Sequence, residues 1–414
     1  TLVETASRQW RVQATDVQVL DGVFIGPSGL KASLAEVVQW AGPEPVPAKQ
    51  VQLKNPTQFK LIGKPTTRLE SRAKVDGSAA FGIDVRQPGL LFAAVRMSPV
   101  RSGKLKSFNA NAVLGKPGIA GVVPFEGGRD ASGGVAVVAD GWWKAKKALT
   151  QIDVQFDDGP MAGFSSSQLQ AVLGKTLDTE NGFGFWKKGD PKDVIRNSDR
   201  VLNAEYFAPY LAHATMEPMN CTVQYSGNSA KVWAPSQVPG FARKAAAKAL
   251  GLSESKVELN LTYLGGGFGR RLETDFITQA AQIAKQFPGK TIQVLWSRED
   301  DMRHDFYRPA CLSRFTAALD KNGKIQAWVN TSAGQAITPG YLPRNAGLPV
   351  FGPDKTASEG AFDAAYEFPN ARVGHATVEL PVPVGYWRAV GHSHHAFFKE
   401  CFLDECAVEA GADP

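Results

Sequence analysis

The clearest hydrophobic pattern in the chain covers residues 257–284, where a period of two gives way to a helical period. Apolar and polar side chains alternate from Val257 to Tyr263, which is typical of a β-strand. After a glycine-rich interval, apolar residues recur on what would be one face of a helix, at Leu272, Phe276, Ile277, Ala280, Ile283 and Ala284. The pattern therefore predicts a strand, a glycine loop and a helix in succession.

The loop between these two elements, residues 264–271, has the sequence Leu-Gly-Gly-Gly-Phe-Gly-Arg-Arg. Its glycines are Gly265, Gly266, Gly267 and Gly269. Glycines let the backbone approach a ligand closely, and a helix N-terminus offers free N–H groups to an anion. Arg270 and Arg271 add guanidinium groups that suit phosphate, and Phe268 is expected to form an aromatic wall. We therefore expect a phosphate-bearing ligand here; the alternative is a tight turn that binds nothing.

Two familiar phosphate-binding motifs do not fit this loop. A dinucleotide-binding Gly-x-Gly-x-x-Gly starting at Gly265 needs a glycine where the chain has Arg270. A P-loop needs Gly-Lys followed by Ser or Thr, which the sequence Gly-Arg-Arg-Leu does not supply. The loop thus departs from both of these nucleotide-binding patterns.

Weaker patterns along the chain mix helices and strands, so we expect an α+β protein. In the first 160 residues we expect helices at 1–11, 33–40 and 142–150, strands at 16–20, 23–26, 90–97, 134–139 and 152–156, and a stiff linker at 42–47. Beyond residue 160 we expect a helix starting at 165–167 and another at 239–250, strands at 201–209, 221–225, 291–296, 311–319 and 324–332, and long loops at 178–190 and 334–367. The block 59–159 reads as a compact module beside the functional part.

Composition narrows the class of protein. The 414 residues are 43% hydrophobic and 21% charged, and the net charge of +6 is spread thinly, which argues against a nucleic-acid-binding surface. No apolar run is long enough to span a bilayer. The four cysteines, none of them in a Cys-x-x-Cys pair, predict buried thiols rather than an iron–sulfur or zinc framework. The chain also starts inside a helical pattern and stops as a helix ends, so we expect a segment of a longer polypeptide.

A second stretch with chemical character covers residues 385–395, Gly-Tyr-Trp-Arg-Ala-Val-Gly-His-Ser-His-His. Arg388 follows two aromatic residues on a predicted loop, which suits a buried electrophilic site that stabilises charge developing on a substrate. The alternative is a stacked structural arginine. His392, His394 and His395 lack the spacing of a zinc site, so we expect capping and packing roles for them.

Glu217 is a third candidate, because it precedes a proline among apolar neighbours. It could serve as a catalytic acid or base. A structural carboxylate that accepts hydrogen bonds from nearby backbone N–H groups is the favoured interpretation.

Taken together, these motifs resemble one known family. The chain is similar to the molybdenum-cofactor subunit of the xanthine dehydrogenase/aldehyde oxidase family, and most similar to the isoquinoline 1-oxidoreductase beta subunit type. The resemblance runs from about residue 60 to the end. Its carriers are Phe59–Pro65, Ala73–Gly77, Glu217–Asn220, Gly265–Arg271 and Tyr386–Gly391.

The resemblance implies a domain order and a cofactor. Residues 1–55 would be the end of an upstream molybdopterin-binding segment plus linker, 56–160 the family's hammerhead α/β domain, and 161–414 part of a multi-domain molybdopterin-binding α/β region. The cofactor would be molybdopterin cytosine dinucleotide carrying molybdenum. The partner would be a small subunit with [2Fe–2S] clusters, and a cytochrome c is one candidate acceptor.

The resemblance also assigns roles to residues. The glycine loop, Gly265–Arg271, would lie beside the cofactor, together with Ala389, Val390 and Gly391. Phe268, Tyr386 and Trp387 would line the substrate pocket, and Arg388 would be the active-site arginine. Ala389 and Val390 depart from the family's Arg-Gly-Phe-Gly stretch, and Arg270-Arg271 replaces Gly-Lys, which puts purine substrates in doubt.

The implied reaction is hydroxylation of aldehydes or N-heteroaromatic compounds with water-derived oxygen. The family's base glutamate, in a Gly-Val-Gly-Glu-like stretch, and its Gly-Gln-Gly cofactor loop do not occur, so the base is expected beyond this chain and the segment alone is expected to be inactive. The implied compartment is the bacterial periplasm, with the cytoplasm as the alternative. A rival interpretation from another class is a non-catalytic, phosphate-binding scaffold that uses the glycine loop for an ordinary nucleotide.

Overall fold

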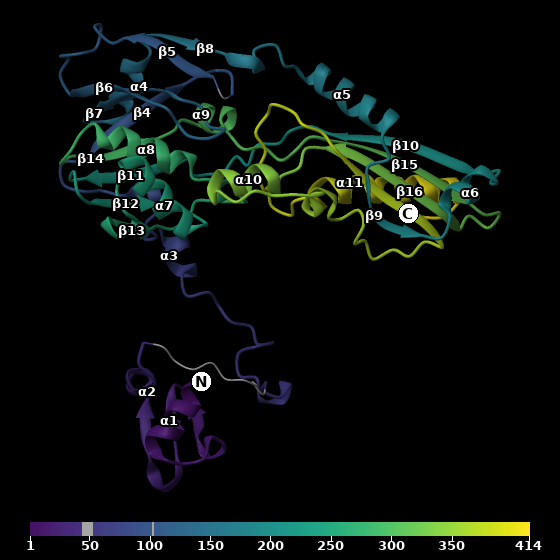
Figure 1. The fold of residues 1–414 in the computed structure, drawn as a ribbon, viewed down its shortest axis with the longest axis horizontal. Helices are drawn as coiled ribbons and strands as arrows, with labels where there is room; N and C mark the ends of the chain where they lie inside the picture. The colour runs from purple at the N-terminus through teal and green to yellow at the C-terminus, as the bar shows by residue number, and fades with distance from the viewer. Residues whose placement is uncertain (44–52, 102) are drawn as a thin grey trace. The chain divides into compact units, whose positions relative to one another are not determined.

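The computed structural model describes residues 1–43, 53–101 and 103–414, which form two compact units, Thr1–Gly77 and Ser78–Pro414 (Figure 1). Both units combine helices with strands, so the predicted α+β class is confirmed. Part of the predicted linker at 42–47 lies outside the described residues. No helix in the described part of the chain is long and apolar enough to cross a membrane.

The first unit is a small helix-and-sheet module. Its elements are α1 (Leu2–Trp10), β1 (Gln18–Leu20), β2 (Val23–Ile25), β3 (Lys31–Ser33), α2 (Leu34–Ala41) and α3 (Ser71–Asp76). The three strands form an antiparallel sheet in the order β1-β2-β3, and β1 and β2 lie within the predicted strands 16–20 and 23–26. Ser33 and Glu36 form a capping box that fixes the start of α2. The rings of Trp10 and Trp40 pack against the core edge to face, with their centroids 6.0 Å apart.

A seven-stranded sheet organises one part of the second unit, in the order β13-β12-β11-β14-β4-β7-β6 (Figure 1). Its strands are β4 (Leu91–Met97), β6 (Ile119–Phe125), β7 (Gly134–Ala139), β11 (Asn220–Tyr225), β12 (Ala230–Ala234), β13 (Val257–Leu261) and β14 (Thr291–Leu295). Helices α7 (Pro239–Leu250) and α8 (Asp275–Lys285) pack on one face, and α4 (Trp142–Leu149) packs on the other. Strands β5 (Lys104–Asn109) and β8 (Asp153–Asp157) form a separate pair.

This sheet crosses the predicted boundary at residue 160. Strand β4 pairs in parallel with β14, with Leu91 opposite Ile292, so the block 59–159 shares a sheet with the region after it. The expectation of a module packed beside the functional part is therefore wrong in this respect, because backbone pairing joins the two. The predicted domain limits themselves stay predictions.

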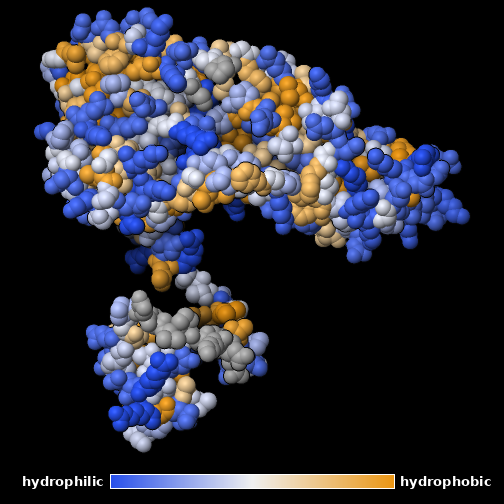
Figure 2. Space-filling view, in the orientation of Figure 1, coloured by the Kyte–Doolittle hydropathy of each residue, from blue (hydrophilic) through white to orange (hydrophobic). Residues whose placement is uncertain are grey.

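A five-stranded sheet organises the rest of the second unit, in the order β10-β15-β16-β17-β9. Its strands are β9 (Phe183–Lys188), β10 (Val201–Ala208), β15 (Cys311–Leu319), β16 (Ile325–Gly334) and β17 (Asn370–Thr377). Successive side chains of β15 point to opposite faces of this sheet. Cys311 packs toward α11 (His392–Ala410), and Leu312 packs toward α5 (Ser166–Thr179). The remaining helices are α6 (Pro191–Arg196), α9 (Arg298–Arg303) and α10 (Thr338–Asn345). Figure 2 shows hydrophobic and hydrophilic residues intermixed over the visible face.

Two predicted loops contain regular structure. The predicted loop 178–190 includes β9, an edge strand whose lysines and glycines hide its alternation and which pairs with β17 through a register shift. The predicted loop 334–367 includes α10, which the pattern missed because Pro343 lies inside this helix and proline normally breaks one. In both cases tertiary pairing or packing outweighs the local signal.

Candidate functional site

The glycine loop leaves the edge strand β13, as predicted, but it does not run straight into an α-helix. Residues Arg270–Leu272 form a single 3-10 turn, and α8 begins only at Asp275. The expectation that both arginines open the α-helix is therefore wrong. Phe276 and the apolar residues after it are buried on α8 as the helical pattern predicted.

Two of the loop glycines are required by the protein's own packing. Gly269 has φ +109°, and a Cβ there would lie 1.6 Å from the carbonyl oxygen of Tyr386. A Cβ on Gly265 would lie 2.4 Å from the Cβ of Glu217. At these positions a side chain is excluded because two other segments of the chain press against the loop.

Arg270 faces the interior rather than a ligand. Its side chain is 1% exposed and donates two hydrogen bonds of 2.8 Å to Asp275, and its Nε lies 3.1 Å from Asp305. Burial by itself would lower the pKa of Arg270, but the charge of Asp275 outweighs it and raises that pKa. The expected direct phosphate donor is therefore absent at this position, and any contribution of Arg270 to cofactor binding is indirect, through the shape of the loop.

Arg271 is also buried, and it joins the glycine loop to Glu217. Its Nε donates to the carbonyl oxygen of Gly266 at 2.8 Å, and its Nη2 donates to the Glu217 carboxylate at 3.1 Å. Burial lowers the pKa of Arg271 to about 10, although the charge of Glu217 acts in the opposite direction. The guanidinium remains charged at neutral pH and serves as an internal brace.

Glu217 is the structural carboxylate that the sequence favoured. One carboxylate oxygen accepts hydrogen bonds from the backbone N–H of Ile83 and the side-chain amide of Asn220, both at 2.9 Å. The other accepts the N–H of Gly265 at 2.8 Å, besides the bond from Arg271. With four donors around it, this carboxylate fixes the start of the glycine loop and has no free face for proton transfer.

Residues 386–391 of the second predicted stretch lie directly against the glycine loop. The N–H of Arg388 donates to the carbonyl oxygen of Phe268 at 2.7 Å. Arg388 is exposed, and among the described residues its guanidinium has neither a hydrogen-bond nor an ion-pair partner. The expectation of a buried arginine is thus wrong for this chain, whereas the proximity of the two stretches is a finding of the structure.

His213 and Asp305 hold the second stretch in place, and neither was predicted as a site residue. His213 Nδ1 lies 2.9 Å from an Asp305 oxygen, and Nε2 lies 2.9 Å from the carbonyl oxygen of Tyr386. Burial would raise the pKa of Asp305, but the hydrogen bonds from His213 and the charge of Arg270 outweigh it and lower that pKa. The signal available in the sequence was the run His213-Ala-Thr-Met-Glu217, in which the histidine lies four residues before the glutamate.

The other predicted residues of this stretch differ in burial, and two of them contact neighbouring segments of the chain. The Tyr386 hydroxyl lies 2.7 Å from Thr338 Oγ1, and the Trp387 indole N–H donates to the carbonyl oxygen of Ala212. Gly391 is buried at the start of α11, where a Cβ would lie 2.6 Å from the carbonyl oxygen of Glu359. Ala389 is exposed and Val390 half-buried.

Strained backbone is concentrated where these segments meet. Phe268 (φ 54°), Ala389 (φ 69°), Val390 (φ 48°) and Ala214 (φ 49°) all have left-handed conformations although none is glycine. Such a conformation costs on the order of 1–3 kcal/mol per residue, and valine in particular rarely adopts it. Strain of this kind persists where a functional geometry requires it, which marks this junction as the candidate site.

The donor groups on the loop fit an anionic ligand. Among the described residues, the backbone N–H groups of Gly266, Gly267 and Phe268 have no hydrogen-bond partner. By contrast, the N–H groups of Gly269 and Arg271 are taken by the side-chain oxygen of Gln237. Three consecutive free donors beside an exposed aromatic ring suit the phosphate and pterin parts of a cofactor such as molybdopterin.

Two clefts in the described part of the chain lie elsewhere. One, of about 990 Å³, is lined by residues that include Lys104, Phe125 and Gln286, and another, of about 430 Å³, by residues that include Lys244 and Thr274. Neither is lined by the glycine loop or by residues 386–391. The strained backbone and the free N–H donors lie at the glycine loop and residues 386–391, and not in either cleft.

The chain is similar to several known proteins. Residues 176–414 match the family described as Molybdopterin cofactor-binding domain. The chain is 29% identical to isoquinoline 1-oxidoreductase subunit beta of Brevundimonas diminuta, over 100% of this chain and 57% of that protein. It is 24% identical to the aldehyde oxidoreductase molybdenum-binding subunit PaoC of Escherichia coli K12, over 86% of this chain and 50% of that subunit. The chain thus spans about half the length of these relatives.

Solved structures share the fold. Quinoline 2-oxidoreductase from Pseudomonas putida 86 matches with a TM-score of 0.65 at 17% identity, over 85% of this chain and 49% of that chain. Aldehyde oxidoreductase from Desulfovibrio gigas matches with a TM-score of 0.63 at 19% identity, over 84% of this chain and 42% of that chain. At these identities the likeness concerns the fold alone.

Proposed function

The chain belongs to the family of molybdopterin cofactor-binding domains, and from this premise we propose that it forms part of the cofactor and substrate site of a molybdenum hydroxylase. When bound, the cofactor supplies the redox-active metal. One observation carries the proposal: the hydrogen bond from Arg388 to Phe268 joins two distant segments at a strained junction that also presents free backbone donors. A bare turn between a strand and a helix has no need of such a junction.

Residues of this chain would divide the work between holding the cofactor and orienting the substrate. The N–H groups of Gly266, Gly267 and Phe268 would bind anionic parts of the cofactor. Gly265, Gly269, Arg270 and Arg271 would act through the shape of the loop, and Ala389, Val390 and Gly391 would close the other side. Phe268, Tyr386 and Trp387 would line the substrate pocket. Arg388 would stabilise negative charge developing on the substrate's oxygen or ring nitrogen.

The substrate class we propose is aldehydes or N-heteroaromatic compounds of the isoquinoline kind, with oxygen derived from water. The names of the relatives support both classes, since one is an isoquinoline oxidoreductase and another an aldehyde oxidoreductase. The cytosine dinucleotide form of molybdopterin, a small [2Fe–2S] partner subunit, a cytochrome c acceptor and a periplasmic location are parts of the same proposal. The base would be a glutamate outside residues 1–414, since Glu217 is fully engaged by its four donors.

The rival function, a phosphate-binding scaffold without catalysis, has less support. A scaffold would account for free N–H donors on the glycine loop. It does not account for an unpaired arginine held beside that loop, or for the strain at Ala389 and Val390. The family match also favours the hydroxylase.

Metal and nucleotide analysis of the purified full-length protein tests the proposal. We expect about one molybdenum per chain, release of CMP on acid hydrolysis, and oxidation of isoquinoline or an aromatic aldehyde. In water enriched in ¹⁸O, the label should enter the product during a single turnover. Protein that contains an ordinary nucleotide and no molybdenum would contradict the hydroxylase and support the scaffold. A product whose new oxygen atom comes from O₂ instead of water would contradict the proposed reaction.

A further inference from the structure

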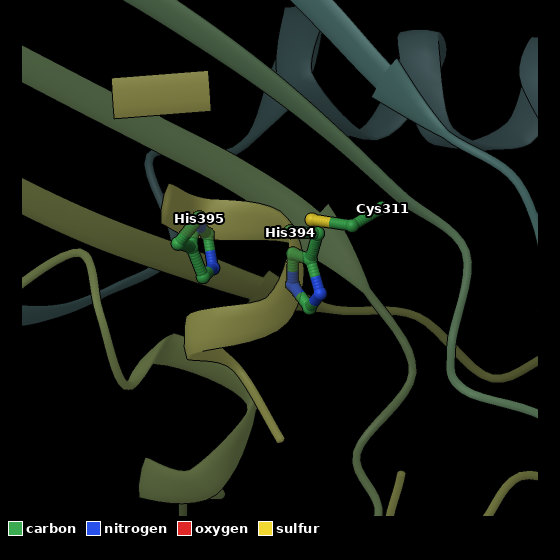
Figure 3. A group of neighbouring side chains, drawn as sticks. All are labelled: Cys311, His394 and His395. Atoms are coloured by element: carbon green, nitrogen blue, oxygen red, sulfur yellow. The ribbon is translucent and has the colours of Figure 1, made fainter. Parts of the chain in front are cut away.

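A buried cluster of two imidazoles and a thiol lies at the start of α11, outside the site described above. Cys311 is the first residue of β15, and His394 and His395 are in the first turn of α11. Their exposed fractions are 1%, 3% and 1%. One possible ligand atom from each residue lies within 4.8 Å of the other two, and Figure 3 shows the Cys311 sulfur facing the His394 ring.

The hydrogen bond of His395 leaves its other ring nitrogen with a free lone pair. Its Nε2 lies 3.1 Å from the carbonyl oxygen of Ala357, which can only accept, so Nε2 carries the proton. Nδ1 then carries the lone pair, and among the described residues this buried atom has no hydrogen-bond partner. A histidine whose other ring nitrogen donates to a carbonyl is the usual form of a metal ligand.

His394 is oriented in the same way by its neighbour. The Ser393 hydroxyl donates to the carbonyl oxygen of Val390 at 2.8 Å, so it can only accept from His394 Nδ1, which lies 3.4 Å away. Nε2 of His394 then carries a lone pair as well. Each histidine therefore has one ring nitrogen that carries no proton and can bind a metal ion.

The charge around the cluster selects the kind of ion. The Arg308 guanidinium lies close enough to the Cys311 thiol for the two groups to interact electrostatically. Exchange of the thiol proton for a monovalent cation leaves the buried net charge unchanged. A divalent cation would add one buried positive charge close to Arg308, which is costly in a dry interior.

We propose that Cys311, His394 and His395 bind one Cu⁺ ion. Thiolate and imidazole are the ligands that soft metal ions prefer. On binding, the Cys311 S–H bond breaks, a sulfur–copper bond forms, and one proton passes to solvent, with no change of oxidation state. The ion would tie the first turn of α11 to β15, and so would stabilise the helix that immediately follows Tyr386–Gly391.

Anaerobic titration of the full-length protein with Cu⁺, in competition with a chromophoric Cu⁺ chelator, tests the site. Wild type should bind one equivalent more than Cys311→Ser and His395→Asn, or bind that equivalent at least 10²-fold more tightly. Two matched controls should behave as wild type: His392→Asn, which changes an exposed histidine of the same helix turn, and Cys401→Ser, which changes a half-buried thiol of the same helix. Far-UV circular dichroism checks that each variant is folded.

X-ray absorption spectroscopy of the copper-loaded wild type identifies the ligand atoms of the copper without the use of variants. We expect one sulfur and two imidazole nitrogens around the copper. A shell of oxygen and nitrogen alone, or equal copper binding by Cys311→Ser, would overturn the site. Binding of Zn²⁺ more tightly than Cu⁺ would overturn the choice of ion, because the charge argument predicts the reverse order.

Discussion

The carbonyl oxygen of Phe268 accepts a hydrogen bond of 2.7 Å from the backbone N–H of Arg388, and both residues belong to stretches that the sequence had marked separately. Gly269 permits this contact, since any side chain there would collide with Tyr386. His213 Nε2 lies 2.9 Å from the carbonyl oxygen of Tyr386 and so holds the segment that contains Arg388. The proposed site therefore depends on a backbone junction, and several predictions concern that junction.

Arg388→Met should lower kcat of the full-length enzyme by about 10²-fold while molybdenum content stays at the wild-type level. This is the lower end of the loss seen when one preorganised electrostatic donor is removed, because an exposed guanidinium is screened by water. Arg388→Lys should recover only part of the rate, since a point charge lacks the planar fork. Steady-state kinetics with metal analysis checks this, and Arg303→Met, in an exposed arginine of α9, is the control. A change in KM alone would mean that Arg388 only binds substrate.

Gly269→Ala should prevent the junction from forming. The positive φ alone costs on the order of 1–3 kcal/mol, and the overlap with Tyr386 adds to that cost. We expect a lower melting temperature and a loss of bound molybdenum. Gly174→Ala is the matched control, because Gly174 lies in α5 with open space around it and alanine favours helix. Normal cofactor content in Gly269→Ala would show that the loop does not hold the cofactor.

Arg270→Met should destabilise the fold by about 3–5 kcal/mol, because it leaves the buried Asp275 carboxylate without its ion-pair partner and leaves Asp305 with His213 alone. Urea unfolding measures the change. The comparison variant is Arg243→Met, which breaks an exposed pair with Glu254 and should cost less than about 1 kcal/mol. Loss of molybdenum from Arg270→Met without any change in stability would instead support a direct contact with the cofactor.

Asp301 should give the stability a distinct pH dependence. Burial raises its pKa to about 6, although the charge of Arg270 acts in the opposite direction. Between the ordinary pKa of 3.8 and about 6 the folded state holds a proton that the unfolded state has released, so stability falls as pH rises through this window. Relative to Asp301→Asn, wild type should lose up to about 3 kcal/mol across it. Urea unfolding at several pH values measures the difference, and parallel curves for the two proteins would contradict the assignment.

The sequence by itself determined the local elements and the two chemical stretches. Alternation marked β13 because the apolar face of that strand packs into the core beneath α7 and α8, and the helical period marked α8 because its apolar residues face the same core. The sequence also marked Gly265 and Gly269 as parts of a glycine loop. The family resemblance depended only on short motifs. Signals of this kind survive in sequence because they depend on neighbours within a few positions.

Only the tertiary structure decided which groups meet. Arg270 and Arg271 look like phosphate donors in sequence, but their buried carboxylate partners include Asp305 and Glu217, which no local pattern connects to the loop. The same holds for Cys311, which lies far along the chain from His394 and His395 and reaches them through the packing of α11 on β15. The physical reason is that ion pairs and hydrogen bonds depend on distance in space, whereas periodicity records only which face of an element is buried.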